Sequence, residues 1–176
     1  AQRTMRIAQQ LYEGIDIKGF GTTGLITYMR TDSLRISEEA RKVATDLIAK
    51  DFGENYLPKK PRYFKSRSSA QDAHEAIRPT NPTLHPEQVK DSLTGEQYKL
   101  YKLIWERFIA SLMAERISDD VAVDILAGEF LFKASESKTR FDGFTALYVE
   151  GKDETEEKSG KLPALTKGDE LKCEKV

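Results

Sequence analysis

A phenol and a guanidinium stand two residues apart in the segment that carries the densest polar chemistry of this sequence. Tyr28 and Arg30 fall in and just after a short apolar run, residues 25–29, whose composition predicts a β-strand. Because side chains at positions i and i+2 of a strand share a face, both groups could reach one phosphate. A tyrosine hydroxyl can act as a nucleophile, and arginine holds a phosphate through paired hydrogen bonds. Spacing alone favours the simpler interpretation, a packed tyrosine followed by a turn in which Asp32 and Ser33 bond the local backbone.

A histidine and an arginine form a second polar group four residues apart. We expect a brief helix over residues 70–77, which ends at Arg78 because Pro79 disfavours helical geometry in the residue before it. Positions i and i+4 share a helical face, so His74 and Arg78 would point the same way, with Glu75 on the other side. No metal site is indicated, since no third or fourth ligand stands at a suitable spacing. Taken alone, this motif favours a solvated surface helix over a catalytic site.

Positive charge gathers between these two groups. Residues 55–71 contain no acid, and their basic side chains are Lys59, Lys60, Arg62, Lys65 and Arg67. Such a run is either a solvated loop or a surface that faces nucleic-acid phosphates, where clustered cations gain from counterion release. The formal net charge of -1 hides this asymmetry: residues 1–116 carry 19 basic and 15 acidic side chains, whereas residues 117–176 carry 9 and 14.

The elements that must position these residues are mainly helical in the first two thirds of the chain. Apolar residues at helical spacing, together with N-capping side chains, predict three longer helices. The wide apolar face of the third helix, from Tyr98 to Met113, indicates core rather than a cofactor site. A glycine-rich stretch, residues 19–24, precedes the apolar run. The three helices run from a cap at Thr4 to residue 13 with Gly14 as the stop, from Ser37 over residues 38–51, and from Thr94 over residues 95–116.

After residue 117 apolar side chains recur at every second position, a pattern typical of strands. Residues 121–125 predict one strand, and Gly128 turns the chain into a second at residues 130–134. Residues 144–149 and 171–176 predict two more, with a charged loop between them. The sequence therefore predicts an α+β fold in two units, a helical one at residues 1–116 and a β one at residues 117–176.

Length and composition exclude several classes of protein. The chain has 176 residues, 39% hydrophobic and 32% charged, which is typical of a folded soluble domain. No stretch approaches the roughly 20 apolar residues of a membrane helix and no signal segment begins the chain, so we expect a cytoplasmic protein. The single cysteine, Cys173, excludes an internal disulfide, and His85 has no evident partner. The first residue, Ala1, suggests a piece of a longer protein.

Two long motifs resemble the signatures of one enzyme family. Residues 24–33 (Gly-Leu-Ile-Thr-Tyr-Met-Arg-Thr-Asp-Ser) are similar to the active-site segment of bacterial type IA DNA topoisomerases. Residues 73–80 (Ala-His-Glu-Ala-Ile-Arg-Pro-Thr) resemble the second signature of that family, in the same order and at a similar separation. Further similarity at residues 5–12, 100–108 and 140–144 extends over most of the chain. Met29 favours the topoisomerase I branch, because a proline is usual at this position in the topoisomerase III branch.

The resemblance implies roles for the residues of both motifs. Tyr28 would attack a phosphodiester of single-stranded DNA and form a 5′-phosphotyrosyl link, and Arg30 would hold the scissile phosphate. His74 would contact that phosphate or assist proton transfer. The DNA-binding residues would be Arg30, Thr31, Asp32 and Arg78. The carboxylates of Asp32 and Glu75 would orient the cationic side chains of the two motifs.

The resemblance also implies a fold, a cofactor and partners. The fold would be a mainly helical, winged-helix-like lobe followed by part of an antiparallel β arch. The parent enzyme would relax negative supercoils without ATP and would use Mg2+ held by an acidic Asp-x-Asp domain, a pattern that this sequence lacks. We therefore expect the metal ligands to lie outside this chain and the chain alone to be inactive. Its partners would be single-stranded segments of negatively supercoiled DNA and the missing domains of the same chain, with no membrane partner, and the protein would be a monomer.

Two other functions fit the residues when the resemblance is set aside. A non-catalytic DNA-binding module of winged-helix type would use the basic run as its footprint. A helical interaction domain would instead bind a protein through the acidic β unit. Removing the Tyr28 hydroxyl separates the enzyme from both, since only a nucleophile would then lose a covalent DNA adduct. The salt dependence of single-strand binding separates the DNA-binding module from the protein-interaction domain.

Overall fold

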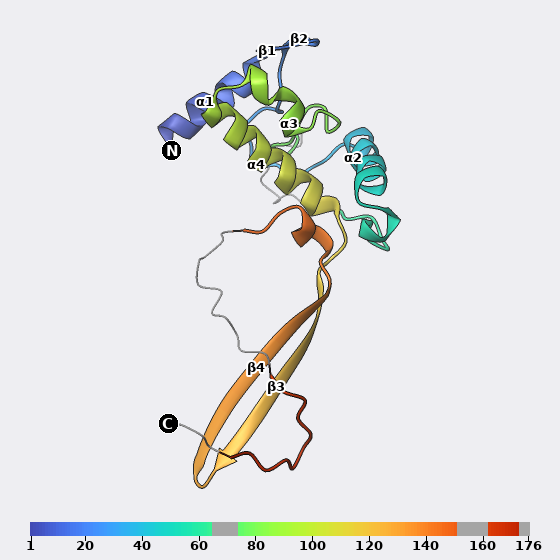
Figure 1. The fold of residues 1–176 in the computed structure, drawn as a ribbon. Coiled ribbons are helices and arrows are strands. Elements are labelled where there is room, and N and C mark those ends of the chain that lie inside the picture. The colour runs from blue at the N-terminus through green and yellow to red at the C-terminus, as the bar shows by residue number, and fades with distance from the viewer. Residues whose placement is uncertain (65–73, 151–161, 173–176) are drawn as a thin grey trace. The chain divides into compact units, whose positions relative to one another are not determined.

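The computed structural model of the chain describes residues 1–64, 74–150 and 162–172 (Figure 1). It contains helices and antiparallel strands, so the predicted α+β class is confirmed. Residue contacts separate two compact units, Ala1–Glu115 with Gly143–Tyr148, and Arg116–Asp142 with Val149–Val176. The division into domains after residue 116 stays a prediction, and residues 143–148 pack with the first unit in the structure.

Four α-helices are found in the described residues of the first unit, and local capping sets the start of two of them. They are α1 (Gln2–Glu13), α2 (Glu38–Asp51), α3 (Pro86–Val89) and α4 (Gly95–Leu112). The Ser37 side chain accepts a hydrogen bond of 3.3 Å from the Ala40 N–H at the start of α2. Thr94 and Gln97 exchange side-chain and backbone hydrogen bonds at the start of α4, a capping box. Both predicted starts are confirmed.

Two other predicted helix ends were wrong. α1 begins at Gln2, so Thr4 lies inside the helix and does not cap it. α4 ends at Leu112 rather than at Arg116, because the chain leaves the helical path at Met113, whose backbone is extended and whose side chain is buried. The next N–H, that of Ala114, then donates to the carbonyl of Tyr56 at 2.7 Å instead of continuing the helix.

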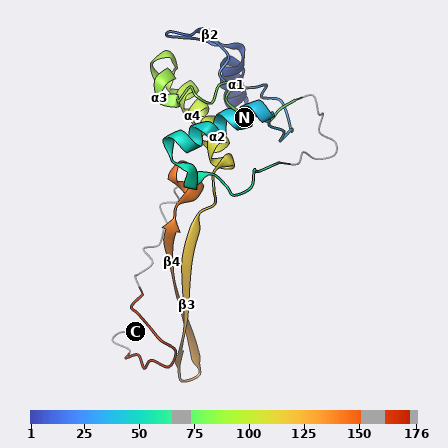
Figure 2. The ribbon, with the colours of Figure 1, turned by 90° about the vertical axis from the view of Figure 1, so that its right-hand side faces the viewer.

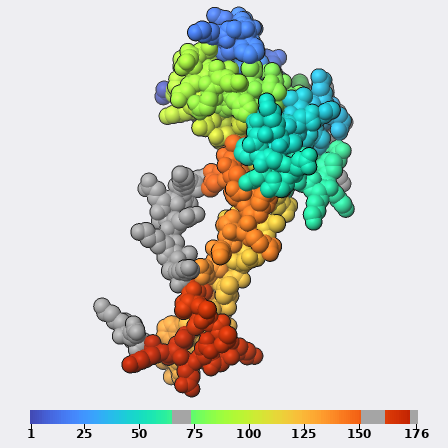
Figure 3. Space-filling model, turned by 45° about the vertical axis from the view of Figure 1, so that its right-hand side comes forward, coloured from blue at the N-terminus to red at the C-terminus, as the bar shows by residue number. Residues whose placement is uncertain are grey.

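The core of the first unit forms around α4. Its inward face, which includes Trp105 and Ile109, is buried together with apolar residues of α1 and α2, so the predicted core role is confirmed. The hydroxyl of Tyr101 donates to the carbonyl of Leu84 at 2.6 Å, and Nε1 of Trp105 donates to that of Pro82 at 2.8 Å. Burial raises the pKa of Tyr101, which keeps its hydroxyl protonated. Figure 3 shows the helices of this unit as one continuous body.

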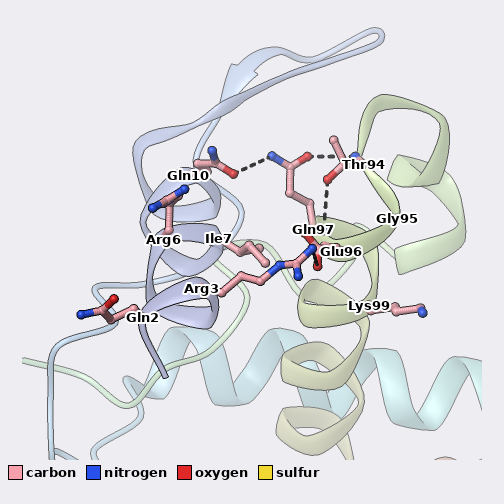
Figure 4. A pocket seen from close by; sticks show the side chains of 10 residues that line it. All are labelled: Gln2, Arg3, Arg6, Ile7, Gln10, Thr94, Gly95, Glu96, Gln97 and Lys99. Atoms are coloured by element: carbon pink, nitrogen blue, oxygen red, sulfur yellow. Dashed lines mark hydrogen bonds and ion pairs between the residues drawn. The ribbon is translucent and has the colours of Figure 1, made fainter.

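Polar side chains join α1 to the first turn of α4 (Figure 4). Nε2 of Gln97 donates to Oε1 of Gln10 at 3.1 Å, and Arg3 forms an ion pair of 2.7 Å with Glu96. These side chains and their neighbours line an open cavity of about 870 Å³. The ion pair is well exposed and adds little stability, so the buried faces of the two helices carry most of their association.

A short hairpin that the sequence did not predict follows α1. β1 (Ile15–Ile17) pairs antiparallel with β2 (Gly21–Thr23), and Ile17 is buried in the core. Gly19 and Gly21 adopt φ values of 86° and 70°, which glycine tolerates and which the tight connection requires. Strands of three residues are too short to display a period of two, so the stretch looked like an irregular connection in the sequence.

The second unit is built on a long antiparallel ribbon (Figure 2). β3 (Ile117–Ala127) pairs with β4 (Phe130–Phe141), and Gly128 turns the chain between them at a φ of 61°. The two predicted strands and their glycine turn are confirmed, although both strands are longer than expected. Large apolar side chains near the turn remain exposed, among them Leu126 at 77% and Phe130 at 65%.

The last two predicted strands do not form in the described residues. The strand predicted at residues 144–149 was wrong. Gly143–Ala146 is a 3-10 helix, and the N–H of Phe144 donates to the carbonyl of Ala114 at 2.9 Å. Leu171 and Lys172 are not in a strand, and residues 173–176 lie outside the described part, as do residues 151–161 of the charged loop. Within that part no helix is long and apolar enough to cross a membrane.

Candidate active site

The two sequence motifs lie side by side in the first unit, although about 50 residues separate them. Ile26 and Pro79 form an antiparallel bridge. The Thr27 N–H donates to the carbonyl of Arg78 at 2.9 Å, and the Thr27 hydroxyl accepts from the Arg78 N–H at 2.9 Å and donates to the carbonyl of Ala76 at 2.8 Å. This short ladder fixes the segment before Tyr28 against the segment after His74.

The predicted helix over residues 70–77 was wrong where the structure describes it. Residues 70–73 lie outside the described part, and residues 74–77 are not helical. The N–H of Ala76 donates to the carbonyl of Arg35 at 2.8 Å, and the N–H of Thr80 donates to that of Leu25 at 3.0 Å. A helix would bond these groups within its own segment, whereas here their partners come from the first motif and its continuation.

Two aromatic side chains contact the ring of Tyr28. The ring of His74 stacks on it, with centroids 5.2 Å apart and planes inclined by 29°. The ring of Tyr12, from the last turn of α1, meets it edge to face at 5.5 Å and 70°. Tyr28 is half-buried, so these contacts restrict the orientation of its ring while part of the side chain stays accessible. In the sequence, Tyr12 stands out only as an apolar residue at helical spacing in α1 and as the last residue of the family similarity at residues 5–12.

A close backbone approach brings Tyr12 to this position. The N–H of Leu25 donates to the carbonyl of Leu11 at 2.7 Å, which ties the first motif to the end of α1. A Cβ atom on Gly24 would lie 2.7 Å from the carbonyl oxygen of Tyr12, closer than real Cβ contacts allow. Only glycine fits at position 24, so Gly24 is required for the close approach that brings Tyr12 into contact with Tyr28.

Arg78 pairs with Glu75 instead of sharing a helical face with His74. Its Nε and Nη2 atoms lie 2.7 and 2.5 Å from Oε2 of Glu75, and Nη1 donates to the carbonyl of Pro79 at 2.9 Å. The side chains of Arg78 and Glu75 are 12% and 19% exposed, so the ion pair is well shielded from water. Such a pair holds the shape of the second motif, because removing either partner would leave a largely shielded charge uncompensated.

The strand expected at residues 25–29 is reduced to the single bridge at Ile26, and the chain bends at Met29 and Arg30. Met29 enters the core at 5% exposure, whereas Arg30 is exposed. The strand argument that placed Tyr28 and Arg30 on one face therefore does not apply. Arg30 nevertheless stands two residues after the tyrosine and is exposed to solvent.

Ser33 bonds the local backbone after Arg30, as predicted, and Thr31 does so as well. The Thr31 hydroxyl accepts from the Ser33 N–H at 3.0 Å, and the Ser33 hydroxyl accepts from the Arg35 N–H at 3.2 Å. Ser33 is buried, whereas Asp32 is exposed. These turns leave the carboxylate of Asp32 at the surface beside the tyrosine segment.

The second histidine has partners, contrary to the sequence-based expectation. Nε2 of His85 lies 3.2 Å from Oδ2 of Asp51, and its ring centre lies 4.8 Å from that of Trp105. His85 thus connects the end of α2 to α4. Among residues 1–64, 74–150 and 162–172, no group of three or more His, Cys, Asp or Glu side chains could hold a metal ion.

Comparison with known proteins agrees with this arrangement of two motifs beside an aromatic cluster. The family model described as DNA topoisomerase matches residues 1–176. The chain belongs to this family, as a fragment of the bacterial type IA kind.

Among solved structures, the full-length topoisomerase I of Thermotoga maritima is similar, with a TM-score of 0.75 and 39% sequence identity. The match covers 93% of this chain and 25% of that chain, so the chain spans about a quarter of the length of this relative.

Proposed function

We propose that Tyr28 cleaves one strand of DNA in a type IA topoisomerase of which this chain is a part. The phenolic oxygen bonds to phosphorus as the bond from phosphorus to the 3′ oxygen breaks. The phenol loses its proton, and the leaving 3′ oxygen takes one up to become a free hydroxyl. The 5′-phosphotyrosyl bond conserves the energy of the phosphodiester, so the reverse reaction reseals the strand without ATP. A second strand passes through the break, which relaxes negative supercoils.

The observation that carries this proposal is the contact of Tyr28 with His74 from the second motif. The stacked ring restricts the phenol, which lowers the cost of orienting it for attack. We assign to His74 either contact with the scissile phosphate or assistance in proton transfer, since an imidazole can do both near neutral pH. Arg30, exposed and two residues after the nucleophile, would hold the phosphate and stabilise the charge that develops on it.

The remaining polar residues are assigned to DNA binding and support. Thr31 and Asp32 continue the chain from Arg30 at the surface, where they would meet the DNA backbone. Arg78 uses three of its five N–H donors on Glu75 and Pro79, and we propose the others for the DNA. Its partner Glu75 keeps the guanidinium oriented.

The proposal includes parts of the enzyme outside the described residues. Mg2+ is consistent with the family, but the described residues offer no cluster to hold it, so we place its ligands elsewhere in the longer protein and route no step through it. The substrate would be single-stranded segments of negatively supercoiled DNA. The other domains of the same polypeptide would complete the enzyme, which would work as a monomer in the cytoplasm, where bacterial DNA lies.

Tyr28→Phe in the full-length protein tests the proposal. It removes the nucleophilic oxygen but keeps the ring that stacks on His74. We expect the covalent adduct with a radiolabelled single-stranded oligonucleotide to disappear from a denaturing gel, while the dissociation constant of the non-covalent complex changes by less than about 3-fold.

Tyr12→Phe is the matched control, because it removes a hydroxyl from the neighbouring ring and leaves the edge-to-face contact possible. This variant should still form the adduct. An adduct that persists in Tyr28→Phe would show that another residue is the nucleophile. Loss of the adduct in both variants would mean that the assay reports a disturbed aromatic cluster rather than the attacking oxygen.

A further inference from the structure

Arg41 is the one charged residue that the structure buries among the residues it describes, and the proposed chemistry does not use it. It lies on α2, and its side chain is 10% exposed. Its guanidinium donates to the carbonyl of Arg62 and lies 4.2 Å from the ring centre of Tyr63, and Nε is 3.7 Å from the carboxylate of Glu38. Burying a guanidinium is costly unless it is well paired. The main effect of the Arg41 side chain is to fix the backbone at Arg62 and the ring of Tyr63 in the loop after α2.

The ring fixed by Arg41 is nevertheless largely open to solvent. Tyr63 is 66% exposed although the guanidinium covers part of it, and the next residue, Phe64, is 38% exposed. An aromatic ring that is held in place and open on one face offers a stacking surface for a planar group. Nucleic-acid bases stack on such rings whatever their sequence, and an arginine against the ring adds a cation–π contribution.

Lysines accompany this ring, and no acid neutralises them in the described residues. Lys59 and Lys60 are exposed, and neither forms an ion pair with a described residue. Two carboxylates near the loop are engaged by arginines: Glu38 lies 3.7 Å from Nε of Arg41, and Glu115 pairs with Arg62 at 3.2 Å. The charge available to an incoming anion therefore comes from the two lysines, on the same loop as the exposed ring.

The loop has features that hold it in one conformation. Pro58 and Pro61 restrict its backbone, and both line a cavity of about 300 Å³ between the loop and α2. Its start is tied to the chain after α4 by the hydrogen bond from Ala114 to Tyr56. A surface that is ordered before binding loses less entropy when a ligand arrives.

We infer that residues 59–64, supported by Arg41, form a second contact for single-stranded DNA, in which Tyr63 stacks on a base and Lys59 and Lys60 contact backbone phosphates. The inference rests on the proposed function in that DNA is the ligand, and it adds a contact away from the two motifs. Exposed rings among cations fit a nucleic-acid strand better than an acidic peptide, which has phosphate-like charge but no bases to stack.

Fluorescence anisotropy tests this contact on the chain itself, with a labelled oligothymidine of about 16 nucleotides. Tyr63→Ala should weaken binding about 10-fold or more, whereas Tyr63→Phe, which keeps the ring, should bind within about 2-fold of the unaltered chain. Phe130→Ala is the control, because it removes an equally exposed ring, 65% exposed, from the ribbon of the second unit and should change nothing.

The lysines give an independent measurement. Replacing Lys59 and Lys60 together with alanine should reduce the slope of log affinity against log salt by about 1.4, the value for two phosphate contacts on a single strand. Lys133 and Lys138 on β4, also exposed, form the matched control pair and should leave the slope unchanged. Circular dichroism of each variant verifies that it folds.

Three results would overturn the inference: no binding of the unaltered chain, an unchanged dissociation constant in Tyr63→Ala, or an unchanged salt slope in the double-lysine variant. The outcome is separable from that of the proposed function. If Tyr28→Phe abolishes the adduct but Tyr63→Ala binds normally, only the second contact fails. If Tyr63→Ala weakens binding but the adduct survives in Tyr28→Phe, the nucleophile assignment fails and the contact stands.

Discussion

At the scale of single residues, the candidate nucleophile is held by neighbours rather than by its own segment. Tyr28 lies between an edge-on ring from α1 and a stacked ring from the second motif. Such aromatic pairs contribute about 0.5–1.5 kcal/mol each beyond the area they bury. The orientation of the phenol therefore depends on two tertiary contacts, and changes that shift either neighbour should affect cleavage without touching Tyr28.

Gly24→Ala tests this dependence. The new Cβ would meet the carbonyl oxygen of Tyr12 at 2.7 Å, and because that atom belongs to a helix backbone, the first motif must move away from α1. We expect a loss of about 1–3 kcal/mol in the free energy of unfolding, measured by urea denaturation of the chain. Slower adduct formation is expected in the full-length protein.

Gly95→Ala is the control for that measurement, because a Cβ there has nothing within 4 Å and the residue opens α4. It should leave stability unchanged or raise it slightly, since alanine favours a helix more than glycine does. Equal stability of the Gly24 and Gly95 variants would contradict the close approach described here.

Residue types and spacing identified two separate pairs, Tyr28 with Arg30 and His74 with Arg78, and only the family resemblance joined them into one site. Neither argument could supply their contacts. Arg78 pairs with Glu75 and not with solvent, and one of the two rings that contact Tyr28 comes from α1. These relations depend on segments about 50 residues apart approaching each other, and no local pattern encodes such an approach. Ser33, in contrast, forms the turn that was predicted, because its partner lies two residues away.

At the scale of elements, the sequence was informative where an element contains its own hydrogen bonds. α2 begins and ends where the pattern predicted, and α4 begins at its capping box. Residues 74–77 were expected to end a short helix before Pro79, but the N–H of Ala76 bonds to Arg35 in another segment. β1 and β2 were missed because three-residue strands carry no periodic signal.

The capping box of α4 is testable by Thr94→Ala. The Thr94 hydroxyl accepts from the Gln97 N–H at 3.3 Å, and Gln97 also bonds to Gln10 of α1. Removing the hydroxyl should lower the free energy of unfolding by about 1 kcal/mol, within a range of roughly 0.5–2. Thermal or urea denaturation of the chain measures this loss.

Thr45→Ala provides the comparison within a helix. Its hydroxyl donates to the carbonyl of Lys42 inside α2 and caps nothing, so alanine should be neutral or slightly stabilising there. If both threonine variants lose the same stability, the loss reflects a general effect of removing a hydroxyl and not the cap.

At the scale of the whole molecule, the chain spans about a quarter of the length of its solved relative, and its described residues contain no cluster that could hold a metal ion. In the proposed function, strand passage needs parts that hold both ends of a broken strand, and this chain with its tyrosine would hold only one of them. We therefore expect the 176-residue chain with Mg2+ to leave negatively supercoiled plasmid unrelaxed on an agarose gel, while the full-length protein relaxes it. Robust relaxation by the chain alone would refute this division of labour.

The ribbon of β3 and β4 departs from the first unit and returns to it at one point, where Phe144 bonds to Ala114 and Gly143 passes tightly against Glu115. A hairpin whose two ends are held together by contacts can change in length without disturbing the unit to which it is attached. Residues can be gained or lost in matched sets on both strands, and in even numbers on each, so that the faces of the ribbon are preserved. Among related chains we therefore expect the ribbon of β3 and β4 to be the part that varies most in length, by steps of four residues.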